Sequence, residues 1–195
     1  TLCRYRFSQY IAQHTLIPSR LVKRMTGLVL AQGHMLDDPW EDRRRTSTAQ
    51  QQEVLSMPEI YENLEAMPKG SMPTGISKAR RSMDYVEVTR LLCLSAMSRD
   101  WLEKQPSSEE IRNAMDEAYT ACEDLRLYFE ASAGRSGTIL FLCDADGGTL
   151  FDLVMVQSLI RMGHKVIFAV KTGFYFYAPT LEDVETDPSL KPWLR

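Results

Sequence analysis

Two short apolar runs flank a segment of helical period near the end of the chain. Thr138–Leu142 is apolar or β-branched and too short for a helix, which predicts a buried strand. Apolar residues recur at helical spacing over Thr149–Met162, and Gly163 follows as a C-terminal cap. A second run, Lys165–Val170, predicts another strand. Because such crossovers are right-handed, we expect the two strands to be adjacent and parallel.

The chain before this segment has the apolar period of helices. A stretch over residues 67–77, rich in proline and glycine, interrupts the pattern and predicts a loop. Ser107 and Glu110 have the spacing of a capping box, so a helix should begin there and continue to Gly134. Helices are also expected over residues 1–36, 46–66 (interrupted by Pro58) and 82–104.

The order of these elements predicts an α/β fold. We expect a helical region over residues 1–135 and, over 136–195, part of a doubly wound parallel sheet with a Rossmann-like strand–helix–strand unit. Two parallel strands are too few for a stable sheet, so the sheet is expected to be incomplete in this chain.

Composition and charge argue against several classes of protein. The 195 residues carry a net charge of −3, which argues against a general nucleic-acid binder. No apolar run approaches the roughly 18 residues of a membrane span, and no secretory signal is visible. Four scattered cysteines are typical of reduced thiols, so we expect an intracellular, reducing compartment, either the cytoplasm or an organelle matrix.

Charged residues follow both predicted strands. Asp144 and Asp146 come after the first strand and precede a glycine pair, and Lys171 comes directly after the second. Ligands bind at the carboxyl ends of parallel strands, and a helix N-terminus favours anions. Two carboxylates and a lysine there would suit a divalent metal and a phosphate. The alternative is that the carboxylates only cap the following helix.

A run of three arginines, Arg43–Arg45, stands among acidic residues. We expect a solvated helix end with local ion pairs. A phosphate or partner contact is the alternative.

The segment that begins at Asp144 resembles two families of phosphatases. The run from Asp144 to Asp152 resembles, more weakly, the first motif of haloacid-dehalogenase-type phosphatases, with Gly148 as one residue too many. The longer resemblance is to the damage-control phosphatases, metal-dependent enzymes that act on sugar phosphates and other metabolites. Residues in register with that family are Asp144, Gly147, Asp152, Leu159, Gly163, Val166, Val170, Lys171, Thr180 and Asp183.

This resemblance implies a metal-dependent phosphatase that has lost part of its site. The family has a metal-binding asparagine where this chain has Ala145 and a glutamate where it has Gly148. An asparagine–aspartate pair is replaced by Tyr177 and Ala178. If the chain is active, the resemblance implies Mg, Mn or Co held by Asp144 and Asp146. Asp144 would be ligand or nucleophile, Asp146 second ligand or general acid, and Lys171 the phosphate-binding residue.

Four consecutive aromatic residues, Phe174, Tyr175, Phe176 and Tyr177, follow the second strand. Exposed together they would form a large apolar patch, so we expect them at an interface. Another polypeptide, or sequence beyond this chain, would complete the sheet.

Three functions are therefore open. The first is a structural or interaction subunit of a protein assembly, descended from a damage-control phosphatase. The second is an active metal-dependent phosphatase acting on small phosphorylated metabolites. The third is a nucleotide-binding or unrelated α/β module, although the chain has no glycine-rich dinucleotide loop.

Overall fold

The computed structural model describes residues 25–29, 38, 40–65, 76–101, 103–104, 106–131, 135–143, 148–172 and 177–194. Residues 25–29 are helical. The further elements are α3 (Glu41–Ser56), α4 (Pro58–Glu65), α5 (Ile76–Met97), η1 (Ser98–Asp100), α6 (Ser108–Ala121), α7 (Glu123–Ala131), β1 (Thr138–Leu142), α8 (Thr149–Arg161), β2 (Lys165–Ala169), α9 (Leu181–Thr186) and η2 (Lys191–Leu194).

The predicted strand–helix–strand unit is confirmed, and with it the α/β fold class. Strands β1 and β2 are parallel neighbours, with Thr138 opposite Lys165 and Leu142 opposite Ala169, and α8 connects them. Gly163 has the predicted role: its φ of 95° ends α8, and the His164 N–H donates to Leu159 O at 3.1 Å. In the described residues the sheet has these two strands alone, so it is incomplete as expected.

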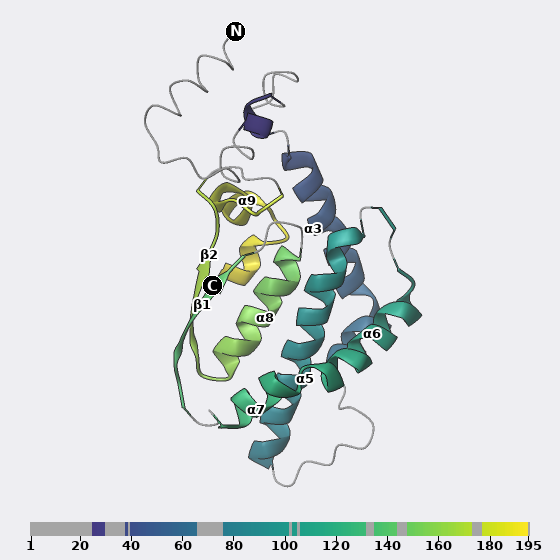
Figure 1. The fold of residues 1–195 in the computed structure, drawn as a ribbon, viewed down its shortest axis with the longest axis vertical. Coiled ribbons are helices and arrows are strands. Elements are labelled where there is room, and N and C mark those ends of the chain that lie inside the picture. The colour runs from purple at the N-terminus through teal and green to yellow at the C-terminus, as the bar shows by residue number, and fades with distance from the viewer. Residues whose placement is uncertain are drawn as a thin grey trace.

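Helix α8 lies at the centre of the molecule (Figure 1). Ten of its 13 residues are buried, because α5 packs on one side of it and the sheet on the other. Phe151 of α8 is fully buried and meets Trp101, which follows η1, edge to face at 5.5 Å between ring centroids. A helix that is apolar on all sides is stable only when it is enclosed in this way.

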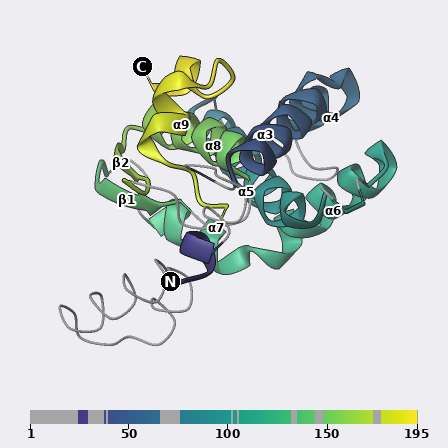
Figure 2. The same cartoon turned by 90° about the horizontal axis from the view of Figure 1, so that it is seen from above.

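The two faces of the sheet differ in their exposure to solvent. Helices α3, α5 and α8 lie on the same side of the strands (Figure 2). On that face Ile139, Phe141 and Val166 pack against the core. On the other face Leu140 and Leu142 are 61% and 69% exposed. Ile167, the partner of Leu140 in the sheet, is 48% exposed.

The helical region differs from the expected boundaries in one informative place. The capping box of Ser107 and Glu110 is confirmed, but the helix that it starts ends at Ala121 and does not continue to Gly134. Cys122 has φ −99° and ψ 37°, outside the helical region. Its carbonyl accepts a hydrogen bond from the Tyr85 hydroxyl at 2.8 Å, so a contact with α5 stabilises the break before α7.

The other helices agree with the expected segments in type. Helices α3 and α4 cover the segment interrupted at Pro58, although α3 begins at Glu41, five residues before the expected start. Helix α5 begins before the expected residue 82. Most of the expected helix over residues 1–36 lies outside the described residues. The division at residue 135 stays a prediction, and the largest hydrophobic cluster contains residues from both sides of it. Among the described helices, none is long and apolar enough to cross a membrane.

Candidate functional site

Of the predicted site and interface residues, the structure describes Lys171 and Tyr177. Asp144 and Asp146 fall outside the described residues, as do Phe174, Tyr175 and Phe176. Lys171 lies at the carboxyl end of β2, where the sequence places it, and its side chain is exposed. Its backbone forms a parallel bridge to Thr180: the Lys171 N–H donates to Pro179 O at 3.1 Å, and Lys171 O accepts from Leu181 N at 2.9 Å.

Gly148 sets the position at which α8 begins. It caps the helix in the left-handed region, at φ 93°. A Cβ atom on this residue would lie 2.4 Å from Ser95 Oγ and 3.0 Å from Ser95 O. The backbone of α8 therefore approaches α5 so closely that position 148 has no room for a side chain.

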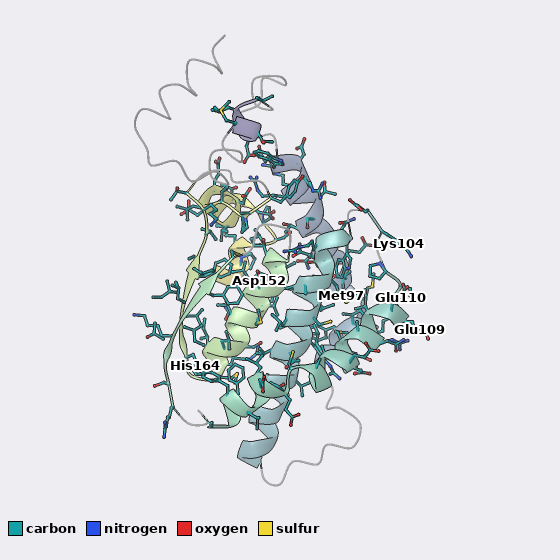
Figure 3. The ribbon with its side chains drawn as sticks, viewed as in Figure 1. Met97, Lys104, Glu109, Glu110, Asp152 and His164 are labelled. Atoms are coloured by element: carbon teal, nitrogen blue, oxygen red, sulfur yellow. The ribbon has the colours of Figure 1, made fainter. Side chains whose placement is uncertain are left out.

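Asp152 is a buried carboxylate in the first turn of α8, between α8 and α5 (Figure 3). Its Oδ1 accepts a hydrogen bond from Ser95 Oγ at 2.7 Å, and its Oδ2 lies 3.8 Å from the Cys143 thiol, a sulfur donor. A carboxylate at the positive end of a helix is stabilised by the helix dipole. The sequence signal for a buried Asp152 is its place within an otherwise apolar helical period, and its register with the damage-control phosphatases implies no specific role.

Gln51 of α3 binds the same helix end. Its side-chain carbonyl accepts from the backbone N–H of Leu150 at 2.9 Å, and its amide donates to Ser47 Oγ at 3.0 Å. Both ends of this fully buried amide are therefore engaged. No local pattern marks Gln51, because its partner on α8 is 99 residues away along the chain.

Arg44 joins the beginning of α3 to α9. Its guanidinium donates to Asp38 at 2.6 Å and to Asp183 at 2.8 and 3.1 Å. Burial alone would raise the pKa of Asp183, but hydrogen bonds from Arg44 and Thr180 outweigh it and hold that pKa below its ordinary value. Burial lowers the pKa of Arg44, but the hydrogen bonds and charges of Asp38 and Asp183 raise it by more. The pKa of Arg44 therefore lies above its ordinary value.

The expected local ion pairs are present at both Arg44, which pairs with Asp38, and Arg45, but the expectation of a solvated helix end is wrong at Arg44. Arg44 is 8% exposed and not solvated, because Asp183 approaches it from a distant part of the chain. Arg45 forms the expected local ion pair with Glu41 at 2.6 Å. Asp183 also forms a capping box with Thr180 at the start of α9, which the spacing of these two residues could have predicted.

A pocket opens beside this ion-pair cluster, next to the N-terminus of α8. Its lining comes from α3, η1, α8 and the segment around α9, and consists of Arg43, Arg44, Arg45, Ser47, Thr48, Gln51, Arg99, Thr149, Tyr177, Pro179, Asp183, Asp187 and Leu190. Lys171 is not among these residues. Tyr177, predicted at an interface, is half-buried here: Trp40 meets its ring edge to face, and the Arg43 guanidinium lies 4.0 Å from its centroid.

The residues described around the pocket do not by themselves form a metal centre. No group of three or more His, Cys, Asp or Glu side chains converges anywhere in the described ranges. Asp152, the buried carboxylate nearest to the predicted ligands in sequence, has both oxygens in contact with Ser95 and Cys143. A divalent cation requires several oxygen ligands, so a metal here would depend on Asp144 and Asp146.

Charged side chains of both signs line the pocket. Four arginines and two aspartates line the pocket, and the positive end of α8 lies beside it. No protein-family model matches the sequence, and no curated protein matches it at a significant level.

Proposed function

We propose that this chain is an interaction subunit, a catalytically degenerate relative of the damage-control phosphatases whose sheet is completed by another polypeptide. One observation carries the proposal: the face of the sheet opposite α8 exposes Leu140, Leu142 and Ile167. In doubly wound proteins both faces of the sheet are covered, and strands of this kind read as continuous apolar runs.

The exposed face has the energetics of a contact surface. Fully burying a leucine or isoleucine side chain contributes about 1.5–3 kcal/mol, and these three side chains are between 48% and 69% exposed. Each strand also has one edge whose backbone groups pair with no other strand in the described part of the chain. An added strand would pair with one of these edges, and a helix across the open face would bury the three apolar side chains.

The interior of the site supports the loss of catalysis. At position 148, where the resemblance implies a glutamate, the contact with Ser95 leaves no room for a side chain. At position 178, where it implies an aspartate, Ala178 is fully buried. The protein around both positions is therefore packed for small residues.

The test compares two variants of the tagged chain, purified from cells that make it. In the double variant Leu140→Thr/Ile167→Thr, two apolar side chains of the open face are removed. Threonine is common in strands, so the variant keeps its tendency to form the sheet. As a control, Leu92→Thr removes another exposed leucine, 40% exposed, from α5. We expect the bound polypeptide to be lost only from the double variant, as measured by light scattering and mass spectrometry. A parent chain that is monomeric, unfolds cooperatively and has protected amides on both strands would contradict the proposal.

A second function, a divalent-metal-dependent phosphatase for small phosphorylated metabolites, is favoured by the arginine-lined pocket at the N-terminus of α8. Asp144 and Asp146 would hold Mg, Mn or Co, and Lys171 would bind the phosphate. The metal, when bound, would polarise the phosphoryl oxygens and offset the charge of the transition state. Calorimetric titration with these three cations, followed by assays on a panel of phosphate esters, tests this function. Absence of both binding and turnover would exclude it.

A further inference from the structure

We propose that the partner covers the open face of the sheet with one amphipathic helix of about three turns, which runs antiparallel to the strands and places a carboxylate beside Lys165. Such a helix presupposes the proposed interaction role and states the kind of polypeptide that fills it. The shape, the charge and the direction of the helix each follow from a different feature of the strands.

The dimensions of the sheet select a helix as the covering element. Successive side chains of a strand alternate between its faces, so the side chains of the open face are Thr138, Leu140, Leu142, Lys165, Ile167 and Ala169. The described part of this face is two strands wide, with about 5 Å between the strands, and one helix of about 10 Å diameter covers it. Each strand has five residues and is about 17 Å long, the length of about three helical turns. Helices cover both faces of the parallel sheets in α/β proteins.

The charge of the open face is unbalanced at one end. Lys165 lies opposite Thr138 at the amino ends of the strands and is exposed. Within the described part of the chain it forms no ion pair, and the other side chains of this face are uncharged. A carboxylate on the covering helix would pair with the ammonium group, whereas a purely apolar helix would partly bury an unpaired charge.

The position of Lys165 also gives the direction of the helix. The C-terminal end of a helix is the negative end of its dipole and favours a nearby cation. A helix antiparallel to β1 and β2 has that end at Lys165 and its first turn over Leu142 and Ala169. Two residues of a strand and four of a helix both span about 6 Å, so apolar side chains at i and i+4 lie over the two apolar rows. A glutamate at i+7 or i+8 then reaches Lys165.

A second copy of this chain fits the open face less well. Two open faces can pack about a twofold axis with their strands parallel or antiparallel between the copies. Lys165 would then meet the row of Thr138 and Lys165, or the row of Leu142 and Ala169, of the other copy. Neither row contains a carboxylate, so the lysine would be buried without a counter-charge. The occupant is therefore a different polypeptide with an acidic residue on its apolar helix.

The experiment uses two fluorescein-labelled helical peptides of equal composition, each of about four turns and fixed by a hydrocarbon bridge on its polar side. Both have leucine at i and i+4. The first has glutamate at i+7 and i+8 and glutamine in its first turn, and the second has these residues exchanged. Fluorescence anisotropy measures their affinity for the full chain and for the variants Lys165→Glu and Leu140→Thr/Ile167→Thr. As the control, Lys104→Glu makes the same change of charge at an exposed lysine that lies apart from the strands (Figure 3).

We expect the parent chain to bind the first peptide about tenfold more tightly than the second, and Lys165→Glu to lose this preference. Lys104→Glu should bind like the parent, and the double variant should bind neither peptide. Equal affinity of the parent for both peptides, preference for the second or no binding of either would overturn the acidic helix.

The purification test of the open face separates this helix from the interaction role itself. If Lys165→Glu keeps the bound polypeptide and only Leu140→Thr/Ile167→Thr loses it, the interaction role stands and the acidic helix does not. Self-association of the parent chain that the double variant abolishes would make a second copy the occupant and would also overturn the acidic helix.

Discussion

Gly148 and Ser95 are packed so tightly that a Cβ atom at position 148 would overlap the Ser95 hydroxyl oxygen, at 2.4 Å. Gly148→Ala should therefore combine left-handed backbone strain with steric overlap, and cost about 2–5 kcal/mol of unfolding free energy. Urea unfolding followed by circular dichroism measures this loss.

Gly163→Ala is the matched control. Gly163 also has a positive φ, of 95°, but nothing lies within 4 Å of a Cβ placed there. This variant should lose only the backbone contribution, about 1–2 kcal/mol. Equal losses in the two variants would show that the contact with Ser95 does not constrain position 148.

Arg44 should be far more important for stability than its neighbour Arg45. Arg44→Met leaves Asp38 and Asp183 without their common cation in a largely buried place, which should cost about 3–5 kcal/mol. Arg45→Met breaks an exposed pair with Glu41 and should cost less than about 1 kcal/mol. Thermal and urea unfolding of both variants provide the comparison, and a similar cost for both would contradict the buried cluster.

The stability of the fold should depend on pH through Asp183. The hydrogen bonds from Arg44 and Thr180 lower its pKa in the folded chain from the ordinary value of 3.8. The group therefore contributes stability that is fully present above about pH 5 and is lost as the pH falls through the folded-state pKa.

Asp183→Asn removes this titration while keeping a similar shape. The variant should be less stable than the parent at neutral pH, and the difference should shrink as the solution is acidified below the ordinary pKa. Unfolding midpoints measured from pH 7 to pH 3 test this, and a constant difference over that range would assign the pH dependence to other groups.

Asp144→Ala separates the degenerate subunit from the active enzyme. In a degenerate chain the change should alter the unfolding free energy by no more than about 0.5 kcal/mol, with or without added metal. Metal that stabilises the parent and has no effect on the variant would instead indicate a bound cation and favour the phosphatase.

Local signals in the sequence predicted those elements whose causes are local. The β1–α8–β2 unit follows from apolar runs, a change of period and a glycine, and the start of α6 from the spacing of Ser107 and Glu110. The break at Cys122 has no such signal, because it depends on the Tyr85 hydroxyl of another helix.

The candidate site was only partly predictable for the same reason. Lys171 follows β2 as expected, because that position depends only on where the strand ends, whereas its role in binding phosphate stays a prediction. The burial of Arg44 could not be predicted, since its partner Asp183 is 139 residues away and the local acidic residues suggested a solvated helix. Whether the four aromatic residues from Phe174 to Tyr177 contact a partner stays a prediction.

The central place of α8 has a consequence for the way the chain folds during synthesis. The helix is apolar on nearly all sides, and α5, which covers one of them, is translated before it. The earlier helices can thus receive α8 as it leaves the ribosome, whereas a fragment that starts at β1 would present α8 with that side uncovered. Such a fragment should aggregate or recruit chaperones, and supplying residues 1–135 as a separate polypeptide should rescue it.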